Sequence, residues 1–182
     1  MQKRLSVRTA YALVRLLWPD FVEVNGCIFV GFQCGNGAVA VKELSRGKTE
    51  TECFINHTHV LDEFRNKASF ETREHFSEQL DVVEETYDNA HPDFIAACEL
   101  GIKIAEMWAL KLKLDFPENR FRVYYTQYDN PIVRFHKVRT DEPVWLCDEA
   151  LQLAKDPSFR NAVIYDTDHL DRPAKKICSI DL

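Results

Sequence analysis

The hydrophobic positions of the first twenty residues recur at helical spacing. Four large apolar side chains are separated by four, three and four residues: Val7, Tyr11, Val14 and Trp18. Ser6 is a favoured N-cap and Pro19 ends the run, so the pattern predicts a helix between them with one buried face.

The next segment has the rhythm of strands. FVEV and CIFV flank Asn25-Gly26, a dipeptide that suits a type I′ turn, so residues 21–30 are predicted to form a hairpin. AVAVKEL, at 38–44, reads as a third strand, and TETECFI, at 49–55, alternates polar and apolar residues as a fourth strand would. The expected arrangement is an antiparallel meander.

The rest of the chain adds helices and a second hairpin. Helical spacing predicts helices over 70–88, 92–114 and 143–155, the second apolar enough around its circumference to be the central core helix. A hairpin is predicted over 121–139 with its turn at Asp129-Asn130, and a late strand over 161–166. We therefore expect one α+β domain over 1–182: an N-terminal helix, with the meander and second hairpin in one antiparallel sheet packed against central helices. The tail, 174–182, is predicted either to add an edge strand or to be mobile.

Composition narrows the possible functions. The chain of 182 residues is 46% hydrophobic, which is enough for a core of its own, and its net charge of -6 argues against nucleic-acid binding. It has neither an apolar run long enough to span a bilayer nor a secretory signal, so we expect a cytoplasmic protein with no membrane partner. The six cysteines lie mostly in apolar runs without a CxxC pair, which favours reduced cysteines; a catalytic role for Cys34 has little support.

The stretch INHTHVLDEF, at 55–64, contains the residue types of a divalent-metal site. His57, His59, Glu63 and Asp62 are candidate ligands, and His59 and Glu63 would lie one turn apart on a helix. The alternative explains more of the segment, since Asn56 is a favoured helix N-cap and the histidines would then occupy an exposed first turn. We favour the helix start.

A second polar cluster follows the late strand. Asp166, Asp168 and His169 could supply metal ligands or a general base, and they could complete a site with the histidines at 57 and 59. The strand followed by DxD is similar to the nucleophile motif of haloacid-dehalogenase-type phosphotransferases, a resemblance over about eight residues. In that family the motif opens the fold, whereas here only eleven residues follow Asp171, so we reject the assignment. A solvated turn is the favoured interpretation.

Two regions of opposite charge complete the candidates. Residues 69–93 contain eight acids and one base, and 120–139 contain five bases and one acid. Alternation along the second hairpin puts four residues where they could bind an anionic ligand: Arg122, Tyr124, Arg134 and His136.

The leading hypothesis is a non-enzymatic interaction protein that uses the acidic helix predicted over 70–88, or the basic strand face, to bind a partner. For the acidic helix that partner would be a basic protein. This hypothesis requires no cofactor. Two alternatives remain: a hydrolase or lyase that depends on a divalent metal, and a protein that binds a small anion. The sequence leaves open whether the chain is an enzyme.

Overall fold

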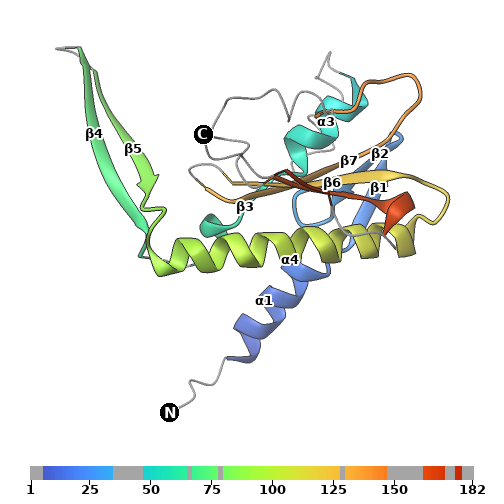
Figure 1. The fold of residues 1–182 in the computed structure, drawn as a ribbon, viewed down its shortest axis with the longest axis horizontal. Helices are drawn as coiled ribbons and strands as arrows, with labels where there is room; N and C mark the ends of the chain where they lie inside the picture. The colour runs from blue at the N-terminus through green and yellow to red at the C-terminus, as the bar shows by residue number, and fades with distance from the viewer. Residues whose placement is uncertain are drawn as a thin grey trace.

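The computed structural model describes residues 6–34, 47–64, 67–77, 80–127, 130–146, 162–170 and 175–177. They form an α+β fold in which a long helix, α4 (Pro92–Asp115), lies across one face of an antiparallel sheet (Figure 1). The strand order of that sheet is β3 (Thr58–His59), β7 (Ile132–Lys137), β6 (Phe121–Thr126), β8 (Ala162–Asp166) and β9 (Lys175–Ile177). The predicted class, central helix, second hairpin and late strand are confirmed, and the tail adds β9 as an edge strand.

The main core lies between α4 and the sheet. It contains Trp108 from the helix and Phe121, Val123 and Phe135 from the strands, all fully buried. Gly101 lets α4 pack closely on the sheet, because a Cβ atom there would lie 2.7 Å from Cε2 of Tyr125. The core thus fixes which face of β6 and β7 points away from α4.

The first hairpin forms a separate two-stranded sheet. β1 (Phe21–Val24) and β2 (Cys27–Val30) turn at Asn25 and Gly26, whose φ angles of 55° and 77° confirm the predicted positive backbone angles. The strands therefore lie in three sheets instead of one. The buried side chain of Asn56 bridges two of them, because it accepts from Val30 N (3.0 Å) and donates to the carbonyl oxygens of Ile28 (2.8 Å) and Phe135 (3.4 Å).

The fourth predicted strand is instead a helix, α3 (Lys48–Ile55). Its start is capped from a distant part of the chain, since the carboxylate of Glu142 accepts from Lys48 N (3.0 Å) and Thr49 N (2.6 Å). The predicted helix start at Asn56 is also wrong, because Asn56 is the C-cap of α3 and the next residues form β3 and a 3₁₀ turn over Leu61–Glu63. Tertiary contacts therefore override the local pattern here.

The helix predicted over 70–88 is a β-hairpin, β4 (Ser69–Ser77) and β5 (Leu80–Tyr87), that projects from the body (Figure 1). In a helix the acids at 74 and 78, 81 and 85, and 84 and 88 would be like-charged neighbours one turn apart, which is destabilising. Backbone pairing from Asp88 N to the Ala68 carbonyl (2.8 Å) closes its base. The acidic helix of the leading hypothesis does not exist, although the acidic segment does.

The N-terminal helix α1 (Val7–Leu17) is confirmed, with Ser6 as its N-cap, but its predicted buried face is exposed. Its apolar stripe is 87%, 66%, 57% and 39% exposed at Val7, Tyr11, Val14 and Trp18. Residues 143–146 are not helical, while the rest of the predicted 143–155 helix and the 38–44 strand lie outside the described residues. No helix among the described residues is long and apolar enough to cross a membrane.

Candidate functional site

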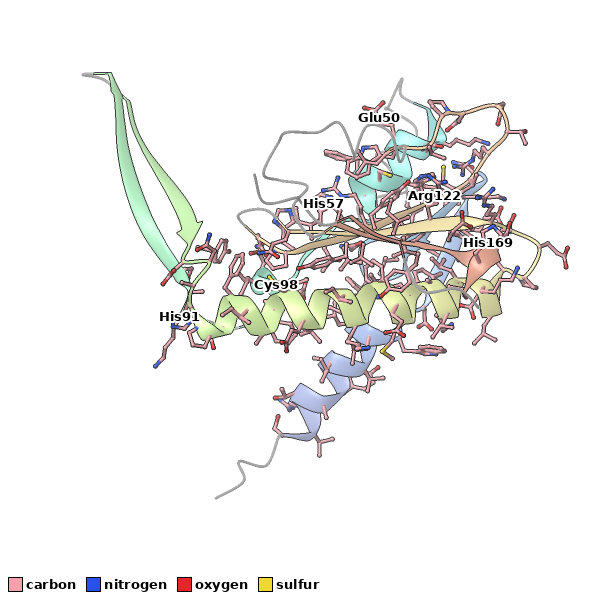
Figure 2. The ribbon with its side chains drawn as sticks, in the orientation of Figure 1. Glu50, His57, His91, Cys98, Arg122 and His169 are labelled. Atoms are coloured by element: carbon pink, nitrogen blue, oxygen red, sulfur yellow. The ribbon has the colours of Figure 1, made fainter. Side chains whose placement is uncertain are left out.

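The sheet face turned away from α4 collects the four residues predicted to bind an anion. Arg122 lies directly opposite His136 across the β6–β7 ladder, and Tyr124 lies opposite Arg134. Their neighbours Val123 and Phe135 point into the core with α4, so these four side chains share the other face. Figure 2 shows Arg122 on that side of the sheet and Cys98 on the side of α4. We call these four residues, with Trp145 above them, the basic-aromatic face.

A stacked pair forms its centre. The rings of Tyr124 and His136 lie 5.6 Å apart at 24°, and the tyrosine hydroxyl is 2.9 Å from Nε2 of His136. Nδ1 of His136 is 2.9 Å from the Lys137 carbonyl, which can only accept, so Nδ1 carries the proton and Nε2 accepts. Burial lowers the pKa of His136 to about 4. His136 is therefore neutral near pH 7, with both ring nitrogens engaged.

Arg134 lies beside this pair without an acid. Its guanidinium carbon is 4.2 Å from the centre of the Trp145 ring, within cation-π range. Its Nε atom is buried without a hydrogen-bond partner, and no described carboxylate pairs with the group. Burial lowers the pKa of Arg134 and raises that of the nearby Cys53 thiol, which is consequently neutral. Within the described structure, Arg134 is a partly buried cation lacking a counter-ion.

Arg122 is only loosely held at the neighbouring position. One of its terminal nitrogens lies 3.5 Å from the Leu146 carbonyl, and its Nε is 3.6 Å from a carboxylate oxygen of Asp166, too far for a hydrogen bond. The main partner of Asp166 is Arg120, which donates hydrogen bonds to its carboxylate from two nitrogens. Despite burial, those bonds hold the pKa of Asp166 below its usual range.

A buried ion pair supports the face from the side of α3. Glu52 is fully buried and accepts from both terminal nitrogens of Arg139 (each 2.8 Å). The same carboxylate accepts from the backbone of Ile28 and Lys137, each at 2.8 Å. It therefore ties β2, α3 and β7 together. Neither this pair nor Trp145 was predicted from the sequence; the signal for Glu52 was a charged residue inside the apolar segment ECFI.

The candidate metal ligands at 57–63 lie close together. The rings of His57 and His59 are 5.2 Å apart, and Nδ1 of His59 is 3.8 Å from a carboxylate oxygen of Asp62. The other oxygen of Asp62 accepts from Tyr87 and Asn130. Burial lowers the pKa of His57, and the positive charge of Arg134 acts in the same direction. Glu63 is exposed in the 3₁₀ turn.

The second group of candidate ligands lies at the other end of the sheet. Thr58 aligns through Val133 and Tyr125 with Val163 on β8, whereas Asp166 is three residues further along, about 10 Å. Asp168 lies 3.6 Å from Arg120 and 3.8 Å from Lys113, and His169 is exposed. The structure thus separates the two groups, and its described residues contain no set of three ligands that could hold a metal.

Comparison of the chain with protein-family models, with curated proteins and with solved structures finds no significant match. The site must therefore be interpreted from its own geometry.

Proposed function

We propose that this chain is a non-enzymatic binding protein whose basic-aromatic face holds an anionic group of its ligand, a carboxylate or a phosphate. The observation that carries the proposal is Arg134, which is partly buried against Trp145 without an acid among the described residues. Desolvating a charge is costly unless it is paired, so an anion supplied by a ligand would stabilise this arrangement.

The arrangement suits an anion with two acceptor groups. Arg122 and Arg134 are diagonal neighbours on the β6–β7 ladder, which places their backbones about 7 Å apart on the same face. Guanidinium groups bind carboxylate and phosphate oxygens in bidentate fashion, and a partly desolvated setting strengthens such bonds. Trp145 supplies apolar contact beside the charges, and the buried Tyr124 supports it from below, with ring centres 5.5 Å apart.

The chemistry of the neighbouring groups favours binding over catalysis. His136 is neutral and uses Nδ1 and Nε2 within the protein, so neither nitrogen is free to take a proton from a substrate. Burial keeps the Cys53 thiol protonated, and a protonated thiol is a weak nucleophile. These features support a ligand site without a reaction step.

The proposal can be tested with the intact protein and two anions, inorganic phosphate and succinate, by isothermal titration calorimetry. We expect one of them to bind, with affinity falling at least about tenfold in Arg134→Ala and less in Arg134→Lys, which keeps the charge but loses the planar fork. Lys67→Ala, at an exposed position, is the matched control. Absence of binding by either anion, or equal binding by wild type and Arg134→Ala, would refute the proposal.

A second candidate is that the β4–β5 hairpin binds a basic protein. It is favoured by one observation: among the described strands, β4 and β5 pair only with each other, and the acidic ribbon projects from the body (Figure 1). An isolated two-stranded ribbon is marginally stable in water, so a partner would stabilise it. Neutralising Glu84 and Glu85 to glutamine should then weaken salt-sensitive binding of poly-lysine more than neutralising Asp115 and Glu118, and equal weakening would count against this candidate.

A further inference from the structure

Helix α1 is held to the body only near its C-terminal end. Leu16 is buried, and its carbonyl accepts from the indole nitrogen of Trp108 (2.8 Å). Lys111 lies over the ring of Trp18, 5.8 Å from its centre. From Val7 to Ala12 every residue is exposed, and Figure 1 shows the helix leaving the face of α4 that is turned away from the sheet.

The exposed side of α1 has the composition of a buried one. Its stripe repeats at four, three and four residues, the spacing of a helix-helix seam. At eleven residues the helix is shorter than the roughly 12–15 residues at which isolated helices become even marginal in water. Something must cover the stripe if the helix is to persist.

The charges beside the stripe select what covers it. Arg8 and Arg15 are seven residues apart, which puts them two turns apart on one edge of the stripe, and α1 contains no acid. Neither arginine has an acidic partner among the described residues. Packing α1 against a second α1 would bring these arginines together, so its cover should be acidic and apolar at once.

The outer face of α4 has both properties. An open hollow of about 500 Å³ on it is lined by Ala96, Glu99, Leu100, Ile102 and Lys103. Ile95 and Leu110 are exposed on the same helix. Glu99 and Glu106 repeat the seven-residue spacing of the two arginines, and Glu106 also accepts from Lys103 on the same helix (2.9 Å), an exposed pair that an incoming arginine would join.

We propose that two copies of this chain form a reciprocal dimer in which α1 of each copy lies on the outer face of α4 of the other. The apolar stripe covers the hollow, and Arg8 and Arg15 pair with Glu99 and Glu106. Tyr11 and Trp18 can each bury on the order of 150–250 Å² when fully enclosed. Because the contact occurs twice, the interface comes within reach of the roughly 1,200 Å² at which specific interfaces begin.

The test is sedimentation equilibrium of the full chain over a range of concentrations. Wild type should be a dimer, and Tyr11→Ser with Val14→Ser should raise the dimer Kd at least about tenfold without loss of folding, since both side chains are exposed. Far-ultraviolet circular dichroism of the variants reports folding. A wild type that is monomeric throughout, or a dimer that is unaffected by these substitutions, would overturn the proposal.

Charge reversal supplies the sharper experiment. Arg8→Glu with Arg15→Glu should put acids against acids, and Glu99→Arg with Glu106→Arg should put bases against bases, so each variant alone should dissociate. Mixed together, the two variants should form a heterodimer, because both of its contacts again join opposite charges.

Glu23→Arg with Glu118→Arg makes the same charge change at exposed positions elsewhere and should leave the dimer intact. If mixing fails to restore association, the proposed pairing is wrong. If the protein is monomeric but α1 binds anionic phospholipid vesicles, a membrane surface is the occupant and the dimer is refuted.

Discussion

Acidification should destabilise this protein through His136 at pH values above those at which Asp166 and Glu142 are protonated. The pKa of this histidine falls from 6.5 in the unfolded chain to about 4 in the folded protein, chiefly through burial. Arg139 and Arg122 lower it further, whereas the Lys137 carbonyl and Glu142 act in the opposite direction. Between these two values the unfolded chain binds the proton more readily than the folded protein does. The stabilising effect of a neutral His136 is therefore complete above pH 6.5 and is lost as the pH falls towards 4.

The size of the loss follows from the two pKa values. Their difference corresponds to a loss of about 3 kcal/mol in the free energy of unfolding between pH 6.5 and pH 4, of which about 2 kcal/mol is lost by pH 5. The pKa values of Asp166 and Glu142 are lowered in the folded protein from their ordinary values of 3.8 and 4.5. The stability that these two carboxylates contribute is therefore lost mainly below pH 5. The pKa of His57 is lowered like that of His136, whereas burial raises the pKa of Glu52, which opposes the loss of stability as the pH falls; both effects have to be measured separately.

Urea unfolding at pH 7 and pH 5 tests this prediction. His136→Gln keeps an acceptor near the Tyr124 hydroxyl but does not titrate. The free energy of unfolding of this variant should therefore fall by about 2 kcal/mol less between pH 7 and pH 5 than that of wild type. His169→Gln, at an exposed position, and His57→Gln are the comparisons. Equal pH dependence in wild type and His136→Gln would show that His136 is not a buried neutral base.

Three further predictions concern contacts of α3 and α4 with the rest of the fold, and each is measured as the free energy of unfolding. Glu52→Gln keeps the shape but opposes an amide to the donors of Arg139 and the backbone, and should lower the free energy of unfolding by about 3–5 kcal/mol. The exposed Glu118→Gln should lower it by less than about 0.5 kcal/mol, and a loss below 1 kcal/mol in Glu52→Gln would refute the role of the pair. Gly101→Ala should cost about 1–2 kcal/mol net, because overpacking against Tyr125 outweighs the better helix propensity of alanine, and a stabilised variant would contradict that contact. Glu142→Ala should cost about 1–2 kcal/mol by uncapping α3, while Asp141→Ala changes little; equal effects would disprove the cap.

Local sequence signals predicted the elements whose structure is decided locally. Asn25-Gly26 determines a turn through its own backbone preferences, and Pro92 starts a helix whose apolar circumference can be satisfied only in a core. The alternation along 121–139 was sufficient to place Arg122, Tyr124, Arg134 and His136 on one face, because strand pairing preserves a period of two.

The predictions from sequence were wrong where residues distant in the chain determine the local structure. The α3 segment alternates like a strand, and the carboxylate that caps its helix comes from Glu142, more than ninety residues away in the chain. Residues 70–88 have helical spacing and β-prone residues at once, and the accumulated acids oppose the helix. Trp145 could not be assigned to the face, because its contacts with Tyr124 and Arg134 are entirely tertiary.

The two buried polar side chains at the end of α3 explain why the basic-aromatic face can keep an unpaired cation. Glu52 and Asn56 are one turn apart, and each satisfies backbone groups of both β2 and β7. These bonds fix β7, and hence Arg134, independently of any contact that the guanidinium itself makes. Arg134 therefore does not need an internal acid to hold its position, and its charge is left for a ligand. Loss of Glu52 should accordingly weaken anion binding through displacement of β7, whereas loss of Arg134 should lower the affinity for the anion at least about tenfold and leave the fold intact.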